Sequence, residues 1–237
     1  MPQAKPSSTL VNWLGYFAIT LLLVLPLSVL TVRAGAWQQG LLLFALSCLG
    51  SLLVLALAGL LLLIPKYADM RKGIGMRMLA ALPGSVLLVS LMAGRGDYPP
   101  IHDITTDTED PPRFVTAEER RGEGSNPLDI KADAIAAQRE AYPDLQTLMT
   151  DKSIDDAFDH ALAVAAAQGW EVIHQDRNAG IIEAVDTTAV MAFKDDVVIR
   201  LRTNADGTLV DIRSVSRVGV SDLGANAARI RAFQQAF

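Results

Sequence analysis

Four arginines lie on two neighbouring segments near the carboxyl end of the chain, Arg200 and Arg202 on the first and Arg213 and Arg217 on the second. An arginine side chain binds a carboxylate or a phosphate through two parallel hydrogen bonds. The four residues therefore form a candidate anion-binding patch, and two sources of the anion remain open. A partner protein, lipid headgroup or ligand would make the patch functional, whereas carboxylates of the same chain would make it structural.

Both segments alternate apolar and polar residues, which is typical of β-strands. If residues 206–207 form a two-residue hairpin turn, Arg200 lies opposite Arg213, and Arg202 lies opposite Asp211. Like charges directly opposite each other destabilise a sheet unless an anion lies over them. The internal candidates for that anion are Glu183, Asp186 and the carboxylates of the acidic segment before the domain.

A second polar group follows in the sequence, formed by Ser214, Ser216, Asp222, Asn226 and Arg229. Asn226 falls on the apolar stripe of the last predicted helix, where an amide without partners would cost about 1–3 kcal/mol. We expect it to bond with Ser214, Ser216 or a loop carbonyl and so fix the helix in register, with a ligand contact as the alternative. Asp222 and Arg229 are expected to be exposed.

Metal-binding signals are weak. His102, Asp103 and Asp107 have suitable side chains, but an isolated His-Asp pair with a distant Asp is a poor metal motif. Cys48 is the single cysteine and lies in an apolar run, so thiolate zinc sites and an intramolecular disulfide are excluded. We assign no metal and no cofactor.

Catalytic signals are equally weak. Asp195 and Asp196 are read first as a loop before a strand and only second as an acid and base pair. His160 and His174 have no serine or cysteine context that would form a triad. We assign no catalytic residues, and a hydrolase-type enzyme is the second alternative to a binding module.

Three apolar runs in residues 1–96 predict a membrane anchor: 13–32, 40–64 and 78–94. The first two are long enough to cross about 30 Å of hydrocarbon at about 1.5 Å per residue. The third is shorter and contains Pro83, so its crossing depends on Arg77 and Arg95 reaching the two interfaces. A cleaved signal peptide fits the first run poorly, because its uncharged stretch is too long.

The loop between the second and third runs is strongly basic, with Lys66, Arg71, Lys72 and Arg77, while the preceding loop holds only Arg33. The positive-inside rule places the basic loop in the cytoplasm. Three crossings then put the amino terminus inside and residues beyond 97 outside, in the periplasm of a Gram-negative cell with the anchor in its inner membrane. If the third run does not span, the domain returns to the cytoplasm.

The remaining chain is acidic, with a net charge of −11 against +6 for residues 1–96, which argues against nucleic-acid binding. Residues 97–127 are proline-rich and predict an extended strap. Residues 128–237 predict an α+β domain, in which two helices cover one face of an antiparallel four-strand meander. The expected elements are helices at 128–141, from Ser153 to Gly169, and at 221–237, and strands at 170–175, 181–187, 197–203 and 208–218.

Three separated strings also carry a family resemblance: HDITTDTEDPP (102–112), FKDDVVIR (193–200) and VDIRSVSRVGVSDLGANAARI (210–230). They resemble the bacterial domain of unknown function family 1499, over about residues 101–237. The resemblance implies apolar membrane segments ahead of the domain and supplies no reaction, ligand or catalytic set. We therefore expect a non-catalytic binding or assembly module with a bilayer and a membrane or periplasmic protein as partners. The first alternative is a domain that binds an anionic small ligand or lipid.

Overall fold

A computed structural model describes residues 8–94 and 96–237 of the chain. The chain divides into two compact units, Met1–Arg95 and Gly96–Phe237. Each unit has its own packed interior, mainly apolar with a few buried serines in the first and built around a sheet in the second. Arg95, expected to flank the third apolar run, lies outside the described residues.

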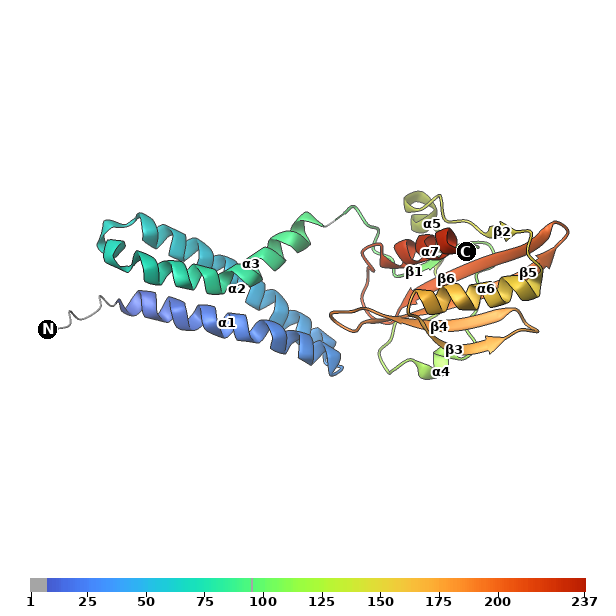
Figure 1. Cartoon of the computed structure of the whole chain (residues 1–237), viewed down its shortest axis with the longest axis horizontal. Coiled ribbons are helices and arrows are strands. Elements are labelled where there is room, and N and C mark those ends of the chain that lie inside the picture. The colour runs from blue at the N-terminus through green and yellow to red at the C-terminus, as the bar shows by residue number, and fades with distance from the viewer. Residues whose placement is uncertain (1–7, 95) are drawn as a thin grey trace. The chain divides into compact units, whose positions relative to one another are not determined.

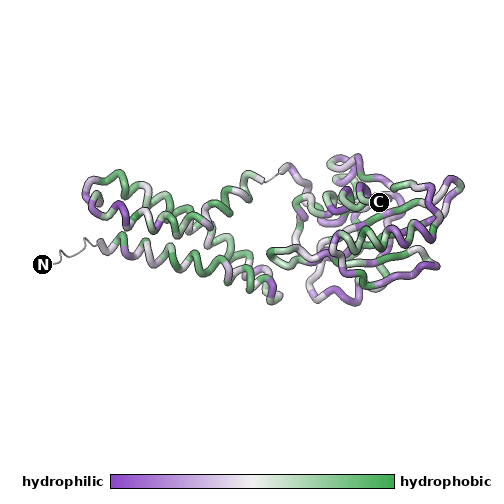
Figure 2. Tube along the Cα trace, in the orientation of Figure 1, coloured by the Kyte–Doolittle hydropathy of each residue, from purple (hydrophilic) through white to green (hydrophobic). Residues whose placement is uncertain are grey.

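The first unit is built from three long helices, α1 (Thr9–Arg33), α2 (Trp37–Leu63) and α3 (Arg71–Ala93), with the short 3-10 helix η1 (Pro65–Met70) before α3. All three are long and apolar enough to cross a membrane. Large apolar side chains cover their outer surfaces, including Leu23, Leu53 and Leu91, and Figure 2 shows hydrophobic residues along all three. The predicted apolar helices are confirmed, and the third run forms one continuous helix.

Small residues bring these helices together. A Cβ atom added to Gly84 of α3 would lie 2.4 Å from the hydroxyl of Ser51 in α2, so the two backbones approach closely here. Gly40 packs in the same way against Val32 of α1. Figure 1 shows a bend in α3, and Pro83 lies inside this helix, where a proline removes one backbone hydrogen bond.

The second unit contains a six-stranded sheet in which β6 (Gly207–Ser216) pairs with three other strands. The sheet order is β1 (Asp103–Thr105), β6, β5 (Lys194–Asn204), β4 (Ile181–Thr187) and β3 (Glu171–Asp176), and β2 (Leu148–Thr150) also pairs with β6. Every pairing is antiparallel. The predicted meander corresponds to β3 through β6, and the short strands β1 and β2 were not predicted.

Two helices cover one face of this sheet, as predicted: α6 (Ile154–Ala167) and α7 (Ala225–Ala236). The hydroxyl of Ser153 accepts a hydrogen bond from the amide of Asp156 and caps α6. Phe158 of α6 and Phe233 of α7 are buried in the core, against strand residues such as Ile199 and Ile212. A further helix, α5 (Ala132–Ala141), forms within the range predicted for it.

The other face of the sheet is covered by the proline-rich segment. Besides β1, this segment contains a four-residue helix, α4 (Ala117–Arg120), which was not predicted. Amides and side chains of the proline-rich segment bond to residues of β4, β5 and β6. Both faces of the sheet are therefore buried, one under helices and one under a largely irregular segment.

The predicted hairpin register is wrong by two residues. Arg200 lies opposite Asp211 and not Arg213, because Asn204 pairs with Gly207 and the turn consists of residues 205–206. Gly207 lies within the strand, where a Cβ would stand only 2.2 Å from the carbonyl oxygen of Thr150. The close approach of β2 thus requires a glycine in this strand position. A shift of two preserves which residues share a face, so the predicted face assignments hold.

Candidate functional site

The sheet face opposite α6 and α7 carries all four predicted arginines, Arg200, Arg202, Arg213 and Arg217, and is called the arginine face below. The strands alternate, so these side chains point away from the helices and toward the proline-rich segment. Each guanidinium forms at least one ion pair with a carboxylate of the same chain. The structure therefore brings the predicted patch together and supplies its anions internally.

Arg200 and Arg202 share three carboxylates, those of Asp107, Asp110 and Asp211. Asp107 Oδ2 lies 3.0 Å from a terminal nitrogen of each arginine, and Asp211 Oδ2 lies 3.1 Å from Arg200 and 2.7 Å from Arg202. Burial alone would raise the pKa of Asp107, but the amides of residues 109–110 and the two guanidinium groups hold that pKa below its ordinary value. The carboxylate of Asp107 is therefore stabilised in its charged form.

Arg213 is the most enclosed of the four. Its guanidinium forms two bonds with Asp103 of β1, at 3.0 and 2.7 Å, and donates to the carbonyls of Pro112 and Leu128. Its guanidinium carbon also lies 5.3 Å from the ring centroid of Phe114. These contacts attach three points between residues 103 and 128 to β6.

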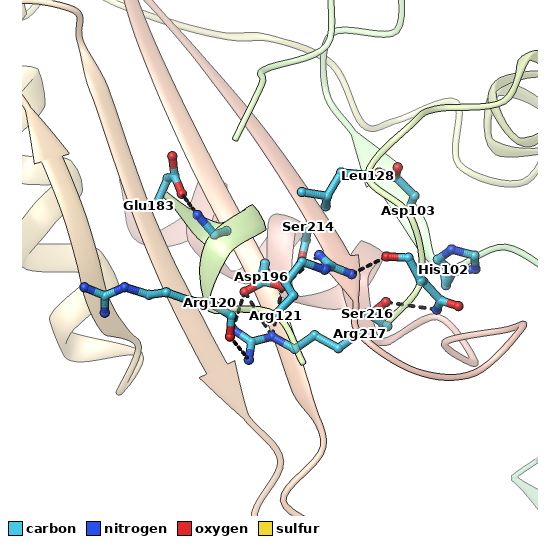
Figure 3. A network of polar contacts seen from close by, with 12 residues as sticks. His102, Asp103, Arg120, Arg121, Leu128, Glu183, Asp196, Ser214, Ser216 and Arg217 are labelled. Atoms are coloured by element: carbon cyan, nitrogen blue, oxygen red, sulfur yellow. Dashed lines mark hydrogen bonds and ion pairs between the residues drawn. The ribbon is translucent and has the colours of Figure 1, made fainter. Parts of the chain in front are cut away.

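Asp196 anchors the next pair of arginines (Figure 3). Its side chain is fully buried and accepts three hydrogen bonds from Arg217, the shortest at 2.7 Å, and one from Arg121 at 2.8 Å. Burial lowers the pKa of Arg121, and the neighbouring Arg217 lowers it further, while Asp196 opposes this shift. Sequence reasoning missed Arg121, because no local pattern connects it with a strand 75 residues later.

Glu183 is fully buried on this face, like Asp196 and Asp211, but no arginine or lysine among the described residues pairs with it. It accepts hydrogen bonds from the backbone amides of Val115, Thr116 and Ala117, at 2.7 Å from Ala117 and 3.0 Å from Thr116. Figure 3 shows Glu183 beside the first turn of α4. The glutamate thereby fixes the short helix to β4. The sequence signal for a buried carboxylate here is the glutamate inside the otherwise mainly apolar string IIEAVDT.

The second predicted cluster lies on the other face, under α7. The Asn226 side chain receives a bond from Ser214 at 2.7 Å and donates to the Ser216 hydroxyl and the His102 carbonyl, each at 3.0 Å. The expectation that Asn226 is a buried, satisfied amide is confirmed. These bonds join α7, β6 and the segment entering β1 in one register.

Arg229 corrects one expectation, because it is buried and not exposed. Its guanidinium pairs with Asp195 at 2.6 Å and Asp186 at 2.7 Å, and donates to Ser214 at 2.9 Å. Asp222 is partly buried. Burial raises the pKa of its carboxyl group and outweighs the hydrogen bonds from the amides of residues 224 and 226, which lower that pKa. Both groups therefore belong to the interior of the helix-covered side.

An open groove of about 820 Å³ runs along α6 and α7, and sequence reasoning missed it. Its walls are mainly alanines, and it is called the alanine groove below: Ala163, Ala167, Ala225, Ala228, Ala232 and Ala236. Trp170, Asp186 and Arg229 also line it. The sequence signal that could have indicated this groove is the repetition of alanine at helical spacing, at positions that are exposed in the structure.

The weaker sequence candidates are dispersed. Asp103 and Asp107 are engaged by arginines, while His102 Nδ1 lies 3.3 Å from the carbonyl oxygen of Val220. Over residues 8–94 and 96–237, no group of three or more His, Cys, Asp or Glu side chains is placed to hold a metal. His160 bonds to the carbonyl oxygen of Phe237 at 2.7 Å. None of these histidines approaches the carboxylates of Asp195 or Asp196 within hydrogen-bond distance.

These features define a class of protein: an α+β domain whose single antiparallel sheet is buried on both faces, joined to three apolar helices and locked by arginine–carboxylate pairs. Residues 103–237, more than half of the chain, match the family described as protein of unknown function (DUF1499). The chain belongs to this family. No curated protein matches it.

Proposed function

We propose that this protein is a membrane-anchored module whose folded domain binds another protein of the bacterial envelope and does not catalyse a reaction. The observation that carries the proposal is the alanine groove, an open surface between two well-packed helices. Small side chains on both walls let the backbone of a partner helix or extended segment approach closely. Asp186, which is partly exposed, lies along the same groove and would give a partner a polar position to match.

The state of the ionisable groups favours a binding role over an enzymatic one. General acids and bases must reach one substrate directly or through one water molecule. Here Asp196 is committed to Arg217 and Arg121, and Asp195 to Arg229, on opposite faces of the sheet. The groove itself is lined by alanines, Val164, Gln168, Trp170 and one arginine–aspartate pair. Its chemistry suits contact with a surface better than proton transfer.

The location we propose is the inner membrane, with the amino terminus in the cytoplasm and the folded domain in the periplasm. Three apolar helices of sufficient length and the basic loop at residues 65–77 support this orientation. The acidic, cysteine-free domain is compatible with an oxidising compartment. The partner would then be a periplasmic protein or the periplasmic part of a membrane complex.

A matched pair of substitutions tests the groove. Ala163 and Ala166 are both exposed on α6, but only Ala163 lines the groove. The full-length protein would be captured from mildly solubilised membranes as wild type, Ala163→Arg and Ala166→Arg. We expect a protein retained by the wild type and by Ala166→Arg to be lost with Ala163→Arg. Equal retention by all three forms would show that the groove does not bind the partner.

A further inference from the structure

Arg77 is a cation placed among apolar helices. It lies on α3, and its guanidinium reaches α1, where Nε donates to the Val11 carbonyl at 2.6 Å. One terminal nitrogen donates to the Gly73 carbonyl at 2.6 Å, and the other lies 3.4 Å from the Asn12 side-chain oxygen. All three acceptors are neutral, and among the described residues no carboxylate forms an ion pair with Arg77.

The hydrogen-bond capacity of this guanidinium is only partly used. Arginine carries five N–H donors, and the three contacts leave two of them for another acceptor. Arg77 ends the basic loop at residues 65–77, where a guanidinium meets lipid headgroups as well as water. Two guanidinium N–H donors are therefore available to a headgroup oxygen.

A groove with mainly apolar walls lies beside Arg77. It lies between α1 and α3, encloses about 350 Å³, and is lined by Asn12, Gly15, Tyr16, Ile19, Met76, Arg77 and Ala80. Gly15 makes this approach possible, because a Cβ there would stand 2.9 Å from Arg77 Nε. One end of the groove is thus cationic and polar, and its walls are apolar.

Aromatic residues mark the depth of this site. Trp13 and Tyr16 of α1 are largely exposed, with ring centroids 6.1 Å apart. Tryptophan and tyrosine concentrate at the level of lipid headgroups. The same end of the helical unit carries the basic positions Arg71 and Lys72 in the first turn of α3, so the local charge is positive. An anion at this depth would meet a complementary surface.

We infer that Arg77 and the groove between α1 and α3 bind one anionic phospholipid. The headgroup phosphate accepts hydrogen bonds from the Arg77 guanidinium, and an acyl chain lies along Ile19 and Ala80. A free phosphate ion would use only the polar end, whereas a phospholipid fills both the polar end and the apolar walls. The inference is independent of the alanine groove, because it concerns only the apolar helices.

Native mass spectrometry of the full-length protein in detergent tests the site. Delipidated protein is titrated with phosphatidylglycerol or with phosphatidylcholine of the same acyl chains. For the wild type, we expect the first phosphatidylglycerol to bind about ten-fold more tightly than the first phosphatidylcholine. Equal affinities for the two lipids would overturn the inference.

Two substitutions at the same end of α3 separate a specific site from general attraction. Arg77→Gln should bring the preference to about one, while Arg71→Gln, which removes an equal charge from an exposed position, should keep it. An equal loss in both variants would show diffuse attraction and overturn the inference. Millimolar inorganic phosphate should leave the bound phosphatidylglycerol in place; its displacement would identify a phosphate site instead of a lipid site.

A third substitution covers the case in which Arg77→Gln does not fold. Ala80→Phe leaves every charge in place and fills the groove, so we expect it to lose most of the phosphatidylglycerol preference. Helix content, followed by circular dichroism, should match the wild type. A folded Ala80→Phe variant that keeps the full preference would overturn the inference.

Discussion

Asp195 and Asp196 are consecutive residues of β5, and their carboxylates form ion pairs on opposite faces of the sheet. Asp195 lies 2.6 Å from Arg229 under α7, whereas Asp196 lies 2.7 Å from Arg217 on the arginine face. The alternation of side chains along a strand requires this division. One dipeptide thereby attaches both covering layers to the sheet, the helices on one side and the proline-rich segment on the other.

Replacing Asp196 with Asn should strongly destabilise the domain. Arg217 and Arg121 would keep their buried charges without a carboxylate, and removal of one member of a buried ion pair costs about 3–5 kcal/mol. Chemical denaturation of the full-length protein in detergent measures the loss. Asp206→Asn, at an exposed turn, is the control and should change little. A loss below about 1 kcal/mol in Asp196→Asn would show that the cluster is not energetically central.

Glu183→Gln should release α4 from the sheet. The carboxylate accepts bonds from the backbone amides of residues 115, 116 and 117, and hydrogen bonds to a charged group contribute about 1.5–3 kcal/mol each. Hydrogen exchange at residues 115–117 should therefore accelerate well before the rest of the sheet opens. Glu118→Gln is exposed and should leave those amides protected. Unchanged protection in Glu183→Gln would contradict the role of Glu183.

The stability of the domain should fall in acid partly through Asp107. Its pKa is lower in the folded protein than the ordinary value of 3.8, so its charged form stabilises the fold above that value. This contribution is lost as the pH falls below about 4 through the folded pKa. Thermal unfolding between pH 3 and pH 7 should show a smaller acid loss in Asp107→Asn, which already lacks the charge at neutral pH. If stability falls with pH equally in the wild type and in Asp107→Asn, Asp107 does not contribute to the loss of stability in acid.

Arg213→Ser tests whether the arginine face serves an external anion or the chain itself. Its guanidinium holds Asp103 and two carbonyls of the same chain, so we expect thermal stability to fall by several kcal/mol. At temperatures where Arg213→Ser is folded, this variant should still capture the partner protein that Ala163→Arg fails to retain. Loss of that capture from a fully folded Arg213→Ser protein would instead assign the arginine face a direct binding role.

The orientation of the chain can be measured with reporters joined after Phe237. If the three apolar helices all cross the bilayer, alkaline phosphatase at this position should be active and a green fluorescent reporter should be dark. Moving the reporters to residue 70, in the basic loop, should give the opposite result. An inactive phosphatase with a bright fluorescent reporter at Phe237 would place the domain in the cytoplasm.

Much of the fold follows from local patterns in the sequence. The helices of the first unit follow from long uncharged runs, and the four long strands and α6 follow from alternation, turn residues and the Ser153 cap. The short elements β1, β2 and α4 could not be predicted, because three or four residues carry no period. Their conformation depends on what they pair with, namely β6 for β1 and β2 and Glu183 for α4.

The sequence by itself determined the division between an apolar part and an acidic part, the face on which each arginine lies, and the family. Only the tertiary structure decided where the carboxylates for those arginines come from. Asp103 reaches Arg213 across 110 positions of the chain, and Arg121 reaches Asp196 across 75. Periodicity reports on neighbours a few residues apart, whereas such partners meet only when distant segments pack on one sheet. Burial of both faces then makes each of these charges depend on its partner.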